Sequence, residues 1–172
     1  MKPESPRRVQ PSYRAKEIVK QLTAAPGTPP LKVYALGGLE EIGRNCTVFE
    51  CGDDIVIIDI GLMFPEEGMP GIDYIIPNIS CLRGREKNIR GVILTHGHMD
   101  HIGGLPLTIG RLGNPVIYTA PLTAGIVRKR QEEFGNEKNL RIQIVDAESR
   151  VQLGRHFTFE PFHVNHNISD AF

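Results

Sequence analysis

The composition is that of one globular domain, and the charge balance narrows the kinds of partner. The chain has 172 residues, with 20 Lys and Arg against 20 Asp and Glu, so its formal net charge is zero. This length is enough to bury a sizeable hydrophobic core. A neutral balance excludes a generally basic surface that holds nucleic acid by charge alone, but it permits a local phosphate site. No apolar run approaches the length that a membrane span needs.

Residues 1–30 differ in composition from the rest of the chain. They carry six basic residues against two glutamates, and six prolines: Pro3, Pro6, Pro11, Pro26, Pro29 and Pro30. A segment of this composition does not pack into a core, so it predicts a disordered basic arm in which a short helix over 13–22 is possible. The arm is interpreted as a solvated tail, with contact to RNA as the alternative. Because it has no apolar stretch of the secretory kind, we expect a cytoplasmic protein without membrane partners.

The remaining residues, 31–172, are expected to form the folded domain. Apolar and β-branched runs predict strands over 31–36, 45–51, 55–60, 89–95, 115–119, 140–145, 150–153 and 157–164. Helices are expected from near His101 to Leu112 and over 121–134, and a long Pro/Gly-rich loop precedes the fourth strand. Strands and helices alternate in places and strands follow one another in others, which predicts a layered α/β sandwich.

The stretch "LTHGHMDHIGGLP", residues 94–106, gathers ionisable side chains directly after an apolar strand. His96 and His98 are two residues apart, so on extended backbone both imidazoles point to the same side and can converge on one ion. Asp100 and His101 follow at a helix start, where they can face a second position nearby. A helix N-terminus also disfavours imidazolium, which keeps His101 neutral, as a metal ligand must be.

The donor types indicate which metal these residues suit. Imidazole and carboxylate without thiolate favour Zn²⁺, with Mn²⁺ and Fe²⁺ as alternatives. No CxxC pair occurs among the three cysteines, so a thiolate zinc site is not predicted. Glycines at 97, 103 and 104 leave space for a substrate phosphate. We therefore expect an open catalytic site.

Other polar residues are candidates to complete or support the cluster. His163 and His166 are three apart and would face opposite sides of an extended strand, so only one can reach the metals, and the spacing does not select it. His156 is interpreted as an ordinary half-exposed histidine. Asp59 ends an apolar strand, where an unpaired carboxylate is costly. Asp59 is interpreted in one of two ways. It forms a hydrogen bond that orients a ligating histidine or the loop that carries it, or it caps a helix or turn.

The motif H-x-H-x-D-H after a buried strand, with an aspartate ending an earlier strand, resembles the metallo-β-lactamase superfamily. Three further stretches, "LGGLEEIGRNCTVFE", "IDIGLMFPEEGMPGIDYIIPN" and "VNHNISDAF", are similar to ribonuclease J, a branch of the β-CASP RNA-processing nucleases. The resemblance covers residues 32–172. It implies an αββα sandwich of which this chain carries only the N-terminal half.

The resemblance also implies a ligand set. His96, His98 and His166 match the ligands of one zinc, so His166 is selected over His163. Asp100 and His101 match ligands of the second zinc.

Two details of the match concern residues behind and beside these ligands. Asp59 matches the structural aspartate of the superfamily. The last stretch departs from the usual N-H-S-I-P-D, since Asn167 replaces the serine and Ser169 the proline.

The activity implied by the resemblance is metal-dependent hydrolysis of RNA, in 5′-to-3′ exonucleolytic and endonucleolytic modes. Asp100 is the candidate for orienting or deprotonating the attacking water, beside its role as a ligand. The bridging aspartate, the last histidine ligand and the β-CASP domain are expected beyond residue 172, so the 172 residues alone are not expected to be a competent hydrolase. The full-length protein is compatible with a homodimer or homotetramer.

Two alternatives remain open on the residues alone. The same metals could serve hydrolysis of a small ester or thioester. The chain could also be a non-catalytic module that binds a metal or tethers RNA.

Overall fold

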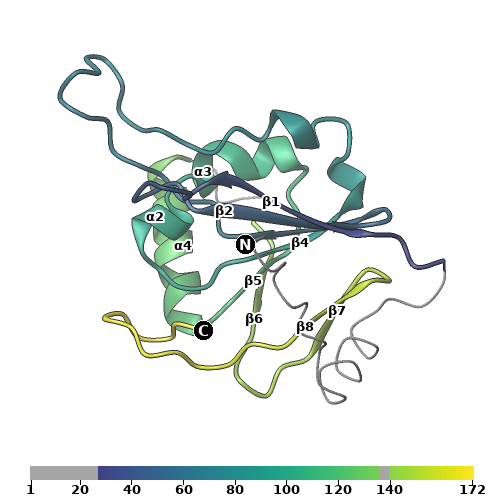
Figure 1. Ribbon diagram of the computed structural model, residues 1–172. Helices are drawn as coiled ribbons and strands as arrows, with labels where there is room; N and C mark the ends of the chain where they lie inside the picture. Colours follow the sequence, from purple (N-terminus) through teal and green to yellow (C-terminus); the bar gives the residue numbers. More distant parts are fainter. Residues whose placement is uncertain (1–26, 136–139) are drawn as a thin grey trace, which may run out of the picture.

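The computed structural model describes residues 27–135 and 140–172 (Figure 1). The predicted helix over 13–22 lies outside the described residues, as does most of the predicted arm. Within the described parts, no helix is long and apolar enough to cross a membrane.

A six-stranded sheet forms the centre of the fold and runs in chain order from β1 to β6 (Figure 1). Its strands are β1 (Leu31–Gly37), β2 (Cys46–Cys51), β3 (Asp54–Ile58), β4 (Ile89–Ile93), β5 (Ile117–Thr119) and β6 (Ile142–Ile144). The first three strands pair antiparallel, with a loop over 38–45 between β1 and β2 and a tight turn between β2 and β3, and β3 to β6 pair parallel. Parallel neighbours need crossovers, which the helical segments supply.

Short helices cover one face of this sheet, and a small second sheet covers part of the other. The helical segments are η1 (Ser80–Leu82), η2 (Glu86–Asn88), α2 (Met99–Ile102), α3 (Leu105–Thr108), η3 (Ile109–Leu112) and α4 (Pro121–Glu133). The second sheet pairs β7 (Val151–Leu153) with β8 (Phe157–Phe159). This layered arrangement agrees with the predicted α/β sandwich.

The two faces of the sheet follow the alternation of side chains along each strand. Ile55 packs with Ile102 and Val127 in the core on the helical side. Its neighbour Val56 points the other way and packs in a second core with Leu153 of β7. β3 is therefore buried on both faces, as its continuous apolar run predicts.

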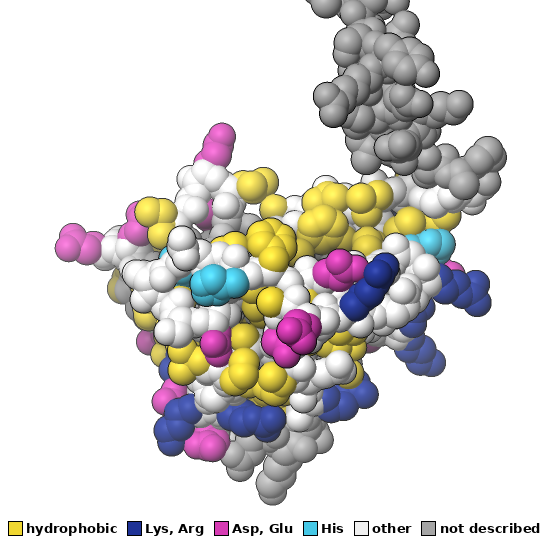
Figure 2. Space-filling model, turned by 90° about the horizontal axis from the view of Figure 1, so that it is seen from below, with side chains coloured by type: hydrophobic (Ala, Val, Ile, Leu, Met, Phe, Trp, Pro, Cys, Tyr) yellow, Lys and Arg dark blue, Asp and Glu magenta, His cyan; other side chains and the backbone are white. Residues whose placement is uncertain are grey.

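The second sheet covers only part of the face of the main sheet on which it packs. Leu31 and Val33 on β1 are 58% and 55% exposed. Val33 pairs with Phe49 and Phe49 with Val56, so these residues share the face that β7 and β8 cover elsewhere. Figure 2 shows this side of the molecule, where apolar side chains lie at the surface. The helices thus cover one face of the main sheet, and β7 and β8 cover only part of the other face.

Two predicted elements are wrong in extent. The helix expected from His101 to Leu112 begins at Met99 and is broken into α2, α3 and η3. It is interrupted at Gly103 and Gly104, where the chain packs closely on the segment after β3. A Cβ at Gly103 would collide with Leu62, and a Cβ at Gly104 would collide with the Gly61 carbonyl. Close packing against the chain after β3 therefore overrides a continuous helix.

The strand expected over 157–164 ends at Phe159, and residues 160–172 have no regular structure. Pro161 lacks the amide donor that a continued ladder needs. His166 consequently lies on an irregular segment rather than on a strand.

Candidate metal centre

The loop after β4 and the segment after β8 bring three imidazoles together. The Nε2 atom of His96 lies 3.0 Å from Nδ1 of His98, and Nε2 of His166 lies 3.1 Å from each of these two nitrogens. Two imidazole ligands of a tetrahedral Zn²⁺, each about 2.0–2.1 Å from the ion, lie about 3.3 Å apart. The spacing and the donor set of these three residues, which we call the histidine triad, therefore fit a divalent cation.

Asp100 and His101 form a second pair of donors beside the triad. Nε2 of His101 lies 3.4 Å from Oδ2 of Asp100, and the ring centroids of His101 and His96 are 4.0 Å apart. Both residues are on α2, whose first turn begins directly after His98. The four residues of the loop motif thus face one region, as their spacing predicts.

Asn45 also belongs to this site, although the sequence analysis did not single it out. Its Nδ2 lies 3.2 Å from Oδ2 of Asp100 and 3.3 Å from Nε2 of His101, and it donates to the Asp100 carbonyl at 3.1 Å. Asn45 is 55 residues before Asp100, so only the tertiary fold brings them together. The asparagine orients both side chains of the second pair.

Asp59 is the buried carboxylate behind the site. Its Oδ1 accepts the Thr95 backbone N–H at 2.8 Å, and its Oδ2 lies 2.7 Å from Nδ1 of His101. This contact places the His101 proton on Nδ1 and leaves the Nε2 lone pair facing Asp100. The structure therefore pairs Asp59 with a histidine of the cluster and with the loop that carries the others.

The Thr95 hydroxyl extends this arrangement to a second imidazole. It donates to Asp59 Oδ2 at 2.9 Å and lies 3.0 Å from Nδ1 of His96. Because the hydroxyl has a single proton, its donation to Asp59 leaves its oxygen to accept the Nδ1–H of His96. The Nε2 lone pair of His96 then points into the triad.

Burial keeps His96 in the form that a metal requires. Burial, together with the nearby His101, lowers the pKa of His96 to about 4, so the ring is neutral at ordinary pH. For His101, burial acts to lower the pKa, but the hydrogen bond to Asp59 and the negative charges of Asp59 and Asp100 together outweigh it. The pKa of His101 is therefore raised, and the expectation that the helix N-terminus keeps this ring neutral is wrong. A cation at His101 must therefore compete with a proton.

Glycines let the loops of the site pack closely. A Cβ on Gly97 would lie 2.6 Å from Cδ1 of Ile126 on α4. A Cβ on Gly61 would collide with the Asp100 carbonyl. The loop that carries His96 and His98 therefore packs directly on α4, and α2 packs directly on the chain that follows β3.

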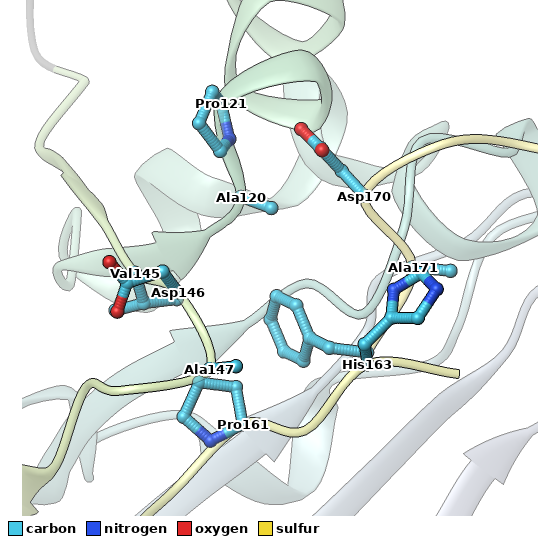
Figure 3. A pocket seen from close by; sticks show the side chains of 10 residues that line it. Ala120, Pro121, Val145, Asp146, Ala147, Pro161, His163, Asp170 and Ala171 are labelled. Atoms are coloured by element: carbon cyan, nitrogen blue, oxygen red, sulfur yellow. The ribbon is translucent and has the colours of Figure 1, made fainter. Parts of the chain in front are cut away.

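The remaining histidines lie away from the triad. His163 lines a separate cavity beside the N-terminus of α4, where Figure 3 shows its side chain. His156 is exposed, and its backbone N–H donates to Asp54 at 3.0 Å. Of the two histidines that spacing could not separate, the structure brings His166 to His96 and His98.

Comparison with known proteins defines the class to which this fold and site belong. Residues 39–168 match the family described as the metallo-beta-lactamase superfamily. The chain therefore belongs to the metallo-beta-lactamase superfamily, and the predicted fold class is confirmed.

Solved structures share the fold at low sequence identity. The Zn²⁺-bound PqqB of Methylobacterium extorquens aligns with a TM-score of 0.51 at 14% identity, over 77% of this chain and 55% of that chain. The flavodiiron protein of Giardia intestinalis aligns with a TM-score of 0.50 at 15% identity, over 77% of this chain and 33% of that chain.

Within the superfamily, the similarity is to ribonuclease J. The chain is 43% identical to ribonuclease J of Thermus thermophilus over 145 residues, which are 81% of this chain and 25% of that protein. It is 38% identical to ribonuclease J of Synechocystis over 145 residues, 84% of this chain and 23% of that protein. The resemblance to ribonuclease J is thus confirmed, and the chain spans about a quarter of the length of these relatives.

Proposed function

We propose that this chain contributes the metal-binding loops of an RNA phosphodiester hydrolase of the ribonuclease J kind. The observation that carries the proposal is the triangle of imidazole nitrogens, 3.0–3.1 Å apart, formed by His96, His98 and His166. The identity to proteins named ribonuclease J supports RNA as the substrate.

In this proposal the triad would hold one divalent cation, and Asp100 and His101 would supply two ligands to a second. Zn²⁺ is the ion that the donor types favour, with Mn²⁺ as the alternative. When bound, such cations lower the pKa of water and stabilise negative charge on a phosphoryl group. Further ligands of the second ion would come from polypeptide outside these 172 residues.

Asp100 is the residue that we propose to act on the attacking water. Its side chain is 38% exposed, so a substrate can approach it. Asn45 donates to its Oδ2 at 3.2 Å, which fixes the carboxylate without neutralising it. A fixed, solvent-accessible carboxylate can accept a proton from water or orient it.

We further propose that residues 31–172 are the N-terminal part of a larger metallo-β-lactamase domain. The open face at Leu31 and Val33 supports this proposal, since exposed apolar residues on a sheet face suit additional packing. The exonucleolytic and endonucleolytic modes, the cytoplasmic location, the basic arm over 1–30 and assembly as a homodimer or homotetramer are predictions for the full-length protein.

The test compares variants of the full-length protein on labelled RNA with added Zn²⁺ or Mn²⁺. His96→Ala and Asp100→Ala are each expected to reduce the cleavage rate at least about a hundredfold, because both remove groups that act on the reacting phosphate. Asp53→Ala, at the exposed turn between β2 and β3, is the matched control and should cleave like the wild type. Undiminished cleavage by either site variant contradicts the proposal, and faster turnover of a chromogenic ester than of RNA would favour a small-substrate hydrolase.

A further inference from the structure

We infer that Asp170 is a positioning residue for His166: its carboxylate caps the N-terminus of α4 and thereby fixes the loop that carries this histidine. The inference rests on the proposed function, because it assigns Asp170 a role in the same metal centre. Asp170 lies four residues after His166 on the irregular segment that follows β8.

The helix α4 lacks a cap from its own sequence. Its N-cap residue is Ala120, whose side chain makes no capping hydrogen bond, and its first turn contains no acidic residue. Oδ2 of Asp170 accepts the backbone N–H of Leu122 at 2.6 Å. Figure 3 shows the Asp170 carboxylate pointing toward the start of the helix at Pro121. A carboxylate at this end satisfies a free N–H and is favoured by the helix dipole, together worth about 1 kcal/mol.

The same contact defines where His166 lies. The Val164 N–H donates to the Ala171 carbonyl at 3.1 Å, so residues 164–171 form a closed loop that contains His166. Ala171 is 2% exposed, and the Phe172 N–H donates to the Thr95 carbonyl at 3.2 Å. One end of the loop is thus held by α4 and by the residue directly before His96.

The helix is a common support for both halves of the triad. Gly97, between His96 and His98, packs so closely on Ile126 of α4 that a Cβ there would lie 2.6 Å from it. The same Cβ would lie 3.3 Å from Ile168 of the His166 loop. Both loops contact α4, the first through Gly97 and the second through Asp170. A loss of the Asp170 cap would therefore move His166 relative to the other two imidazoles.

The backbone conformation at Asp170 decides which substitutions remove the capping hydrogen bond without straining the chain. Asp170 has φ of +68°, a left-handed conformation that Asn and Gly tolerate and Ala does not. Asp170→Asn keeps both the conformation and a hydrogen-bond acceptor. Asp170→Gly keeps the conformation and removes the acceptor, whereas Asp170→Ala loses both.

The experiment measures Zn²⁺ affinity by chelator competition, and the visible absorption of bound Co²⁺, on these variants of the full-length protein. We expect Asp170→Gly and Asp170→Ala to weaken Zn²⁺ binding about tenfold or more and to change the Co²⁺ spectrum. Asp170→Asn should stay within about threefold of the wild type. Asp146→Asn is the matched control, because Asp146 lines the same cavity but its carboxylate accepts hydrogen bonds from Glu148 and Ser149. Thermal unfolding shows which variants are folded. If Asp170→Ala does not fold, the comparison of Asp170→Gly with Asp170→Asn carries the test.

His166→Ala separates failure of this inference from failure of the proposed function. If His166→Ala loses Zn²⁺ affinity while Asp170→Gly binds like the wild type, the positioning role of Asp170 is overturned and the metal centre stands. If His166→Ala itself binds Zn²⁺ like the wild type, the proposed centre fails and the inference fails with it. Equal weakening by Asn and Gly would also overturn the cap, because the amide oxygen retains the acceptor.

Discussion

At the scale of single residues, one buried carboxylate sets the chemistry of two imidazoles. Asp59 is 5% exposed, reaches His101 directly and reaches His96 through the Thr95 hydroxyl. In both rings the proton is held on Nδ1 and the Nε2 lone pair is directed into the site. The tautomers of two candidate ligands therefore depend on a residue that touches neither candidate metal position.

Replacing Asp59 tests this dependence. Asp59→Asn keeps the shape and tolerates the φ of +61°, but its amide N–H₂ cannot accept the Nδ1–H of His101. We expect metal affinity to fall about 10–100-fold, as for other residues that orient ligands. Isothermal titration with Zn²⁺ measures it, with Asp53→Asn as the exposed control. Wild-type affinity in Asp59→Asn would show that the tautomers are set by other contacts.

The sequence predicts some members of the site and not others, for a physical reason. The convergence of His96 and His98 follows from their spacing on extended backbone, and Asp59 is notable as a charge at the end of an apolar strand. Asn45 and Asp170 carry no such local signal. Each acts on a segment about 50 residues away, and only the packed fold shows that contact.

At the scale of elements, polar clusters tie the strands to the segments around them. Glu50 on β2 accepts hydrogen bonds from Lys32 on β1 at 2.9 Å and from Arg85 before η2 at 3.0 Å. It is 7% exposed, and the hydrogen bonds from Arg85 and Lys32 lower its pKa from 4.5 to about 2. A carboxylate whose pKa is lower in the folded state stabilises that state while it is ionised.

Glu50→Gln is therefore expected to destabilise the chain in a pH-dependent way. The depressed pKa means that the contribution of Glu50 is fully present above its ordinary value of 4.5 and is lost as pH falls toward about 2. We expect a loss of about 1–2 kcal/mol in the free energy of unfolding near neutral pH, measured with urea. The difference from the wild type should shrink near pH 2. Glu67→Gln, in the exposed loop after β3, is the control, and an equal loss at both pH values would contradict the account.

Sequence patterns predict the elements better where apolar periodicity is long. The strands β2 to β4 and the helix α4 lie where their periodicity places them, within a few residues. The helix expected after His101 is broken because close backbone packing around Gly61 and Leu62 requires glycines within it. That packing involves residues about 40 positions upstream, which a local window does not include.

At the scale of the whole molecule, the parallel strands place the site. Asp59 follows β3 and His96 follows β4, and the carboxyl ends of parallel neighbours meet at one edge of the sheet. α4 and the segment after β8 then bring His166 to the same edge. Residue patterns predict the layered sandwich and the convergence of His96, His98, Asp100 and His101. Spacing alone does not select His166, because it lies on a segment without periodic structure, and only the family resemblance points to it.

The central claim is that His96, His98 and His166 bind a common divalent cation. The most direct measurement is anomalous diffraction at the zinc edge from crystals of the full-length protein grown with Zn²⁺. We expect a peak about 2.0–2.1 Å from Nε2 of His96, Nδ1 of His98 and Nε2 of His166. A map without a peak there, or one in which the His166 imidazole points away from a zinc held by the other residues, would contradict the account.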